Sequence, residues 1–314
     1  MPRSRNCGHG ARTTPTAAAE LVMVLGSPLF GVVGSPIAHS QSPALHRAAY
    51  AAIGFEARYD RTEIAEGGLA AFVRSAPAER RGLSVTMPLK REAFAAAVER
   101  DRPAELTGAV NTLYRHAEGD VPFFGANTDV GGVVDAVRAG GAPSPSHILV
   151  LGGGATAASV VVAAADLGAD AVTLAVRSPE RASGTVALAR EVGLAADVVA
   201  LDAVASVPAD VVVSTLPGGT ALGALPTTAR DSGALLLDAA YSPWPSALVD
   251  HWFRLDAPVV HGLSMLVHQA SRQVRLFAHL NDRDGDDVTE RITSAMFDVV
   301  GLDHSGVVRR TPTS

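Results

Sequence analysis

The sequence predicts an α/β protein with two domains, and three observations support this. Short apolar runs rich in β-branched residues alternate with helix-like segments along most of the chain, a pattern typical of mostly parallel sheets covered by helices. The 314 residues are 47% hydrophobic and only 18% charged, so most of the length is expected to fold around a core. A glycine and proline cluster at 140–145 separates two series of strands and helices.

The first series of elements is expected to form an α/β domain. Strands are predicted at 30–34, 57–62 and 82–86. Helices are predicted at 42–53, 69–75, 88–98 and 130–139. Ser42 and Pro43 open the first helix as a cap followed by proline in the first turn. Two short apolar runs, 109–114 and 121–125, flank a polar turn and predict a hairpin.

The second series follows the cluster at 140–145. Strands are predicted at 148–151, 171–176, 197–201, 210–214, 234–238 and 258–260. Helices are predicted at 156–167, 182–192, 263–280 and 288–300. The last two helices follow the second sheet and are expected to pack back on the first domain, which would make that domain discontinuous.

The net charge and the cysteine content exclude several classes of partner and site. With 26 basic and 32 acidic residues the net charge is −6, and the absence of a dense basic run argues against nucleic acid as a partner. Cys7 is the only cysteine, which excludes an intrachain disulfide and a cysteine-based metal site and suits a reducing cytoplasm. The uncharged stretch 148–165 is better explained by a strand, a glycine turn and a helix than by a membrane span. The arginine-containing start is interpreted as a flexible tail rather than an export signal.

A glycine-rich turn is the most informative local motif. Residues 152–157 read Gly-Gly-Gly-Ala-Thr-Ala and match G-x-G-x-x-A between a predicted strand and a predicted helix. Small residues there allow a tight turn and let backbone amides approach a pyrophosphate at the helix N-terminus. The motif predicts a Rossmann-type dinucleotide-binding domain, with phosphate contacts from Gly152, Gly153, Gly154, Ala155 and Thr156.

The end of the following strand indicates which dinucleotide is used. An NAD enzyme is expected to place an acid there, against the ribose 2′-hydroxyl. The strand instead ends at Val176 and is followed by Arg177 and Ser178, with Arg181 about one turn further on. Guanidinium groups suit a 2′-phosphate, so NADP(H) is favoured over NAD. For Arg181 the alternative is a solvated charge on a helix face, paired with Glu180.

Candidate catalytic residues lie at the ends of the strands in the first domain, where ligands bind in such sheets. Lys90 is one of few lysines in a chain whose basic residues are nearly all arginine. Because an ammonium can give up its proton near neutrality when it is buried and a guanidinium cannot, Lys90 is a candidate acid/base. The alternative is a surface lysine on the helix after Pro88. The polar residues at these ends are Ser40, Ser42, Ser84, Thr86, Lys90, Asn111, Asn127 and Asp129.

Five segments of the sequence resemble, in the same order, the successive motifs of shikimate dehydrogenases. They are Gly-Ser-Pro-Ile-Ala-His-Ser-Gln-Ser-Pro at 34–43, Val-Thr-Met-Pro-Leu-Lys at 85–90, Gly-Ala-Val-Asn-Thr at 108–112, Asn-Thr-Asp at 127–129 and Gly-Leu-Ser-Met-Leu at 262–266 with Gln269. The resemblance covers about residues 30–300. It implies NADPH-dependent reduction of 3-dehydroshikimate to shikimate, a step toward chorismate and the aromatic amino acids. It also implies a substrate domain from 27–128 and 262–302, an NADP-binding domain at 129–261, and flexible tails at 1–26 and 303–314.

The resemblance also implies roles for individual residues. Ser40 and Ser42 would bind the substrate carboxylate, and Tyr241 would contact the substrate. Lys90 would be the proton donor and acceptor, in a coupled acid/base unit with Asp129, because an ionised Asp129 favours the charged ammonium. The ring hydroxyls would be held by Thr86, Asn111, Asp129 and Gln269. The cofactor would be lined by residues 152–156, Val176, Arg177, Ser178, Arg181, Ala239 and Gly262, with Met265 near the nicotinamide.

Three positions depart from the commonest family pattern. Ser84 and Val176 stand where asparagine is frequent, and His261 stands where an aspartate often precedes Gly262. His261 is interpreted as structural, and no histidine has metal-ligand spacing, so no metal is expected. Quinate or aminoshikimate dehydrogenase is the nearest alternative activity. A non-catalytic metabolite sensor is the alternative from another class, and the presence of both Lys90 and Asp129 argues against it. We expect a small-molecule substrate, a cytoplasmic location, no membrane contact and a homodimer.

Overall fold

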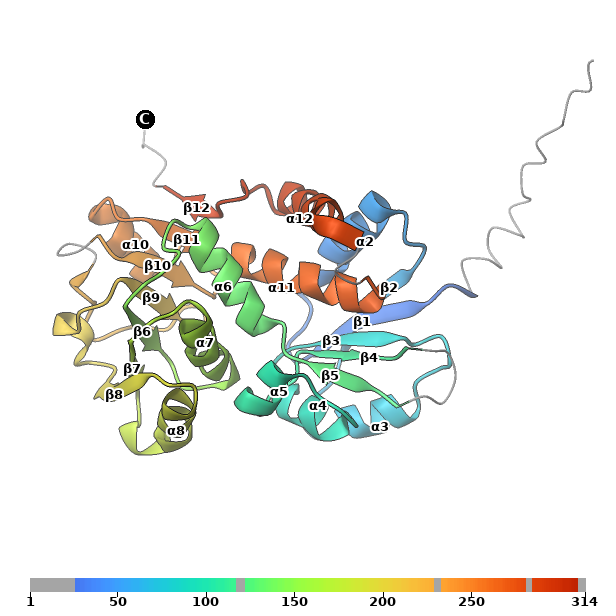
Figure 1. The fold of residues 1–314 in the computed structure, drawn as a ribbon, viewed down its shortest axis with the longest axis horizontal. Coiled ribbons are helices and arrows are strands. Elements are labelled where there is room, and N and C mark those ends of the chain that lie inside the picture. The colour runs from blue at the N-terminus through green and yellow to red at the C-terminus, as the bar shows by residue number, and fades with distance from the viewer. Residues whose placement is uncertain (1–25, 117–121, 229–232, 281–283, 310–314) are drawn as a thin grey trace, which may run out of the picture.

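Residues 26–116, 122–228, 233–280 and 284–309 are described by the computed structural model, in which two sheets lie side by side with helices around them (Figure 1). The prediction of a mixed α/β fold with a Rossmann-type second sheet is confirmed. Most predicted elements are present within one to three residues of their expected ends. Two α-helices and one strand were not predicted: α5 (Arg102–Thr107), α10 (Ala247–Arg254) and β12 (Val307–Val308).

The first sheet has five strands in the order β2-β1-β3-β4-β5. Strands β1 (Leu29–Gly34), β2 (Arg58–Glu63) and β3 (Gly82–Val85) are parallel. The expected hairpin is formed by β4 (Thr112–Tyr114) and β5 (Phe124–Ala126), which pair antiparallel. The helices that follow these strands are α2 (Ser42–Ile53), α3 (Leu69–Arg74), α4 (Lys90–Ala96), α5 and α6 (Asp129–Ala139).

The first turns of α2 and α4 differ from the sequence prediction. Ser42 is the first residue of α2 rather than its cap, because Gln41 occupies the N-cap position. The Ser42 backbone N–H is instead bound by the Ser40 side chain, with 3.3 Å between N and Oγ. Helix α4 begins at Lys90 rather than at Pro88, after a turn in which the Leu89 N–H donates to the Thr86 carbonyl.

The second sheet has seven strands in the order β12-β11-β10-β9-β6-β7-β8. Six of them are parallel: β6 (His147–Leu151), β7 (Ala171–Val176), β8 (Ala195–Ala200), β9 (Val211–Ser214), β10 (Leu235–Asp238) and β11 (Val259–His261). Strand β12 pairs antiparallel with β11, so Val307 and Val308 belong to this sheet rather than to a flexible tail. Helices α7 (Ala155–Asp166) and α8 (Ser183–Glu191) follow β6 and β7.

The two C-terminal helices pack on the first sheet, as expected. Helices α11 (Gly262–Phe277) and α12 (Gly285–Val300) lie next to α2 in Figure 1. Phe277 and Phe297 share a buried core with Phe30 from β1, and the Phe30 and Phe277 rings stack with 4.6 Å between centroids. The chain therefore returns to the first sheet after completing most of the second, which brings residues from its last third to the ends of its first strands.

Candidate active site

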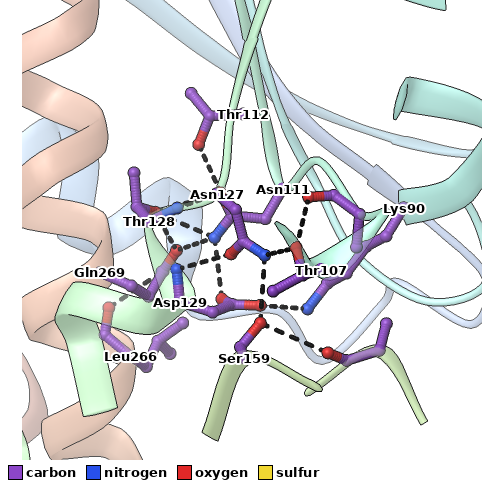
Figure 2. Close-up of polar contacts among 12 residues, drawn as sticks. Lys90, Thr107, Asn111, Thr112, Asn127, Thr128, Asp129, Ser159, Leu266 and Gln269 are labelled. Atoms are coloured by element: carbon purple, nitrogen blue, oxygen red, sulfur yellow. Dashed lines mark hydrogen bonds and ion pairs between the residues drawn. The ribbon is translucent and has the colours of Figure 1, made fainter. Parts of the chain in front are cut away.

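A buried polar cluster lies where α4, α6, α11 and the start of β4 meet (Figure 2). Lys90 is the first residue of α4 and Asp129 the first residue of α6. Asn111 directly precedes β4, and Gln269 lies in the middle of α11. These four residues were predicted as site residues from separate motifs, and the fold brings them into one hydrogen-bonded group.

Lys90 and Asp129 form an ion pair at the centre of this cluster. The distance from Lys90 Nζ to Asp129 Oδ2 is 2.5 Å, and the two side chains are only 14% and 8% exposed. Lys90 is also the only lysine in the chain. A single, largely enclosed ammonium paired with a carboxylate is the arrangement expected of an acid/base unit, and the alternative of a surface lysine is wrong.

Asn111 connects Asp129 to neighbouring side chains. Its amide nitrogen lies 2.8 Å from Asp129 Oδ1, 2.9 Å from Thr128 Oγ1 and 3.2 Å from Gln269 Oε1. Its amide oxygen accepts the Thr128 backbone N–H at 2.9 Å. Because that N–H can only donate, it determines which way the Asn111 amide faces. Thr128 was not predicted as a site residue, although it lies within the Asn-Thr-Asp motif at 127–129.

Asn127 supports the start of α6 and reaches the second sheet's helices. Its side-chain oxygen accepts the Asp129 backbone N–H at 3.1 Å, and its amide nitrogen donates to Ser159 Oγ of α7 at 3.1 Å. The Asn127 N–H in turn binds the Asp101 carboxylate, which also caps α5. Burial raises the pKa of Asp101, and these backbone donors oppose that rise. The cluster is therefore held from both sheets.

Thr86 directly follows β3, whereas Ser40 and Ser42 lie at the end of the loop after β1 and at the start of α2; β1 and β3 are neighbours in the first sheet. His46 Nδ1 lies 2.9 Å from the Ser42 carbonyl oxygen. Burial lowers the pKa of His46 to about 4, so at neutral pH the ring is uncharged and donates from Nδ1 to Ser42. A Cβ at Gly34 would lie 2.4 Å from Thr86 Cγ2, so only glycine allows the loop after β3 to approach β1 this closely.

The glycine turn at 152–154 has the geometry of a phosphate-binding loop. Gly152 has a φ of +118°, and a Cβ there would lie 2.3 Å from Thr215 Oγ1. Gly154 is the N-cap of α7 and contributes no side-chain cap, and the next two residues, Ala155 and Thr156, are half-buried at the helix start. The amides of the first helical turn have no partner within an α-helix, so they suit an anion such as a pyrophosphate. Val176 packs here, since its Cγ1 would lie 3.1 Å from a Cβ at Gly153.

The candidate 2′-phosphate ligands follow β7. Arg177 is exposed directly after this strand, and Ser178 precedes a short 3-10 helix, Pro179–Arg181. An exposed guanidinium at this point leaves a charged group open to a phosphate. Arg181 ends that helix, and its side chain lies outside the described residues.

The remaining predicted cofactor residues lie at the ends of β10 and β11. A Cβ at Gly262 would lie 2.5 Å from the Asp238 carbonyl oxygen and 2.6 Å from that of Ala239, so glycine is required where α11 begins. Met265 is 7% exposed and packs in the core beside β6 and α6. Tyr241 is half-buried after β10, and burial raises its pKa.

His261 has a structural role, as predicted. Its Nδ1 accepts the Leu263 backbone N–H at 3.0 Å and so caps α11. Its ring lies against Trp244 with 3.8 Å between centroids, and burial lowers its pKa to about 4. A neutral ring is needed because a protonated Nδ1 could not accept this hydrogen bond.

Metal-binding clusters and membrane-spanning helices are both absent from the described residues. No group of three or more histidine, cysteine, aspartate or glutamate side chains there could hold a metal ion. None of the helices in the described ranges is long and apolar enough to cross a membrane.

Comparisons with known proteins agree with this geometry. Residues 32–113 match the family model described as shikimate dehydrogenase substrate binding domain. The chain is 38% identical to a shikimate dehydrogenase (NADP(+)) of Methylobacterium radiotolerans, over 79% of this chain and 90% of that protein. The chain belongs to the shikimate dehydrogenase family. It also matches pentafunctional AROM polypeptide 1 of Lodderomyces elongisporus with 33% identity over 79% of this chain, but spans only 17% of that much longer protein.

Solved structures of family members share the whole fold. The shikimate dehydrogenase of Mycobacterium tuberculosis is 38% identical with a TM-score of 0.71, covering 87% of this chain and 99% of that one. The enzyme of Thermus thermophilus, solved in complex with NADP(H) and shikimate, is 30% identical with a TM-score of 0.70, covering 87% of this chain and 99% of that one.

Gly152→Ala tests the glycine turn. We expect the free energy of unfolding to fall by roughly 1–3 kcal/mol, because the added Cβ meets Thr215 and the residue must adopt a positive φ. Chemical denaturation with urea measures this change. Gly154→Ala is the matched control, since a Cβ there meets nothing within 4 Å. Equal stabilities of the two variants would contradict this account of the turn.

Proposed function

We propose that this protein catalyses the reversible, NADPH-dependent reduction of 3-dehydroshikimate to shikimate. The observation that carries the proposal is that the only lysine of the chain is paired with the buried Asp129 at the ends of the first sheet's strands. The names of its relatives agree with this activity, and the glycine turn and Arg177 suit NADP(H).

Two groups of residues would bind the substrate. Ser40 and Ser42 would hold the carboxylate, and Thr86, Asn111, Asp129, Tyr241 and Gln269 would contact the ring and its hydroxyls. Gln269 reaches the cluster because α11 packs closely on α6, where a Cβ at Gly132 would lie 2.8 Å from Gln269 Cβ. Such fixed side chains would hold the reacting carbon in one orientation.

Lys90 would move the proton. In the reduction its ammonium donates a proton to the carbonyl oxygen as that oxygen becomes a hydroxyl, and in the reverse direction the neutral amine takes it back. Asp129 would keep Lys90 in place and stabilise the ammonium form. Bound NADPH supplies the hydride; residues 152–156, Val176, Arg177, Ser178, Arg181, Ala239, Gly262 and Met265 would hold it.

Oxidation of quinate or of an aminoshikimate is the alternative activity, because the same contacts to a carboxylate and to ring hydroxyls would bind those substrates. The boundaries of the two domains stay predictions, except that residues 307–308 belong to the second sheet rather than to a tail. A cytoplasmic location and a homodimer also stay predictions.

Steady-state rates test the proposed substrate and cofactor together. We expect kcat/KM to be highest for shikimate with NADP(+), when shikimate, quinate and an aminoshikimate are each assayed with NADP(+) and with NAD(+). Faster oxidation of quinate with NAD(+) would replace the proposed activity. Tight binding of shikimate without any turnover would instead favour a metabolite sensor.

Lys90→Ala tests the acid/base role. We expect kcat to fall by roughly 10²–10⁴-fold with a much smaller change in KM, because the proton is transferred in the transition state. Arg91→Ala is the matched control, since Arg91 is the next basic residue of α4 and is exposed. Equal losses in substrate binding and no special loss of kcat would refute the role.

Arg177→Asp tests the choice of dinucleotide. We expect the KM for NADPH to rise by at least about tenfold while that for NADH changes little, because a carboxylate would repel the 2′-phosphate. Arg190→Asp, on the exposed face of α8, makes the same charge change away from the turn. An unchanged preference in the Arg177 variant would remove the basis for its proposed role.

A further inference from the structure

A second chain of buried hydrogen bonds runs from the centre of the first sheet to Asn111. The Tyr59 hydroxyl lies 2.7 Å from Ser84 Oγ, and Ser84 Oγ lies 2.7 Å from Gln273 Oε1. Gln273 Nε2 lies 3.0 Å from Thr112 Oγ1, and Thr112 Oγ1 lies 2.7 Å from Asn111 Oδ1. Figure 2 shows the last of these bonds.

Backbone groups determine the direction of each donor in this chain. Gln273 Nε2 also lies 3.1 Å from the Asn111 carbonyl oxygen, which can only accept, so the Gln273 amide nitrogen faces Asn111 and its oxygen faces Ser84. Ser84 must therefore donate to Gln273 and accept from Tyr59. Burial raises the pKa of Tyr59, which keeps its hydroxyl protonated as a donor.

The same reasoning applies beyond Gln273. Because Gln273 donates to Thr112, the Thr112 hydroxyl directs its own proton to Asn111 Oδ1. Asn111 then donates from Nδ2 to Asp129, the partner of Lys90. All donors thus point the same way, toward Asp129. Tyr59, Ser84, Asn111, Thr112 and Gln273 are each at most 4% exposed, so water does not compete for these bonds.

We propose that Gln273, with Ser84 and Tyr59 behind it, is a positioning residue that sets the Lys90–Asp129 pair through Thr112 and Asn111. This inference rests on the proposed dehydrogenase function for its kinetic part. The proposal explains why a serine stands at position 84, where asparagine is frequent in the family. The Ser84 hydroxyl accepts a hydrogen bond from Tyr59 and donates one to Gln273. This series of hydrogen bonds begins near the proposed carboxylate site, since the Tyr59 ring stacks on His46, whose Nδ1 lies 2.9 Å from the Ser42 carbonyl oxygen.

Lys90 offers a direct readout, because it is the only lysine in the chain. Protein labelled with carbon-13 lysine gives one lysine Cε signal, whose pH titration reports the charge of Lys90 without any turnover. In the parent protein, the hydrogen bond from Asn111 to Asp129 draws on part of the negative charge of that carboxylate. Leucine at position 273 has a similar volume to glutamine but cannot form the hydrogen bonds to Ser84 and Thr112. The series of hydrogen bonds is then interrupted, and more of the Asp129 charge acts on Lys90. We expect the Lys90 titration midpoint to rise by roughly half a pH unit or more.

The steady-state rates of Gln273→Leu should agree with the titration of Lys90. We expect Gln273→Leu to lower kcat/KM for the proposed reaction by roughly 10–100-fold, since small displacements of catalytic groups have effects of this size. Ser271→Ala is the matched control: Ser271 is buried on the same helix, and its hydroxyl has no hydrogen-bond partner among the described residues. Ser271→Ala should leave the Lys90 titration midpoint within about 0.1 pH unit of the parent value and kcat/KM within about twofold.

A structural role alone predicts a different outcome. The inference is overturned if Gln273→Leu lowers Tm but leaves the Lys90 midpoint and kcat/KM unchanged in folded protein. If Gln273→Leu does not fold, Tyr59→Phe tests the proposal instead, because it removes only the hydroxyl that donates to Ser84. We expect Tyr59→Phe to raise the Lys90 titration midpoint by less than Gln273→Leu would, and an unchanged midpoint would overturn the proposal. An inactive parent protein would refute the proposed function, whereas the Lys90 signal would still decide this inference.

Discussion

The ion pair between Lys90 and Asp129 is the interaction on which the rest of the site depends. Removing two charges from water is costly, and the attraction between them offsets this cost only when further hydrogen bonds complete the site. Asp129 has such bonds from Asn111 and stands at the N-terminus of α6, the end where a negative charge is favoured. Lys90 stands at the same end of α4, where a positive charge is disfavoured. Its charged form therefore relies on Asp129.

The fold keeps this pair in place through close approaches between helices. Gly132 lets α11 pack against α6 so that Gln269 reaches Asn111. Asn127 binds both the backbone of Asp129 and Ser159 of α7, the helix that begins at the glycine turn. The proposed chemical groups and the proposed dinucleotide turn are thus connected by a short path of hydrogen bonds.

Prediction from the sequence succeeded where the local pattern was strong. The glycine turn lies between a five-residue buried strand and a twelve-residue helix, and each has a clear signal of its own. Helix α5 was missed because it has only six residues, although Asp101 and Pro103 are typical of a helix start. Strand β12 was missed because its two residues become a strand only by pairing with β11, which lies far away in the sequence.

The sequence by itself determined the residue types and their order: one lysine in the first turn of a helix, an aspartate after a strand, and a glycine turn that only small residues can form. Only the tertiary structure decided which of them meet. Gln273 lies 189 residues from Ser84 and 161 from Thr112, and no local pattern links these positions. Their contact exists because α11 returns to cover the first sheet. Hydrogen bonds depend on distance and direction in space, so the groups that set the Lys90–Asp129 pair become recognisable only in the folded chain.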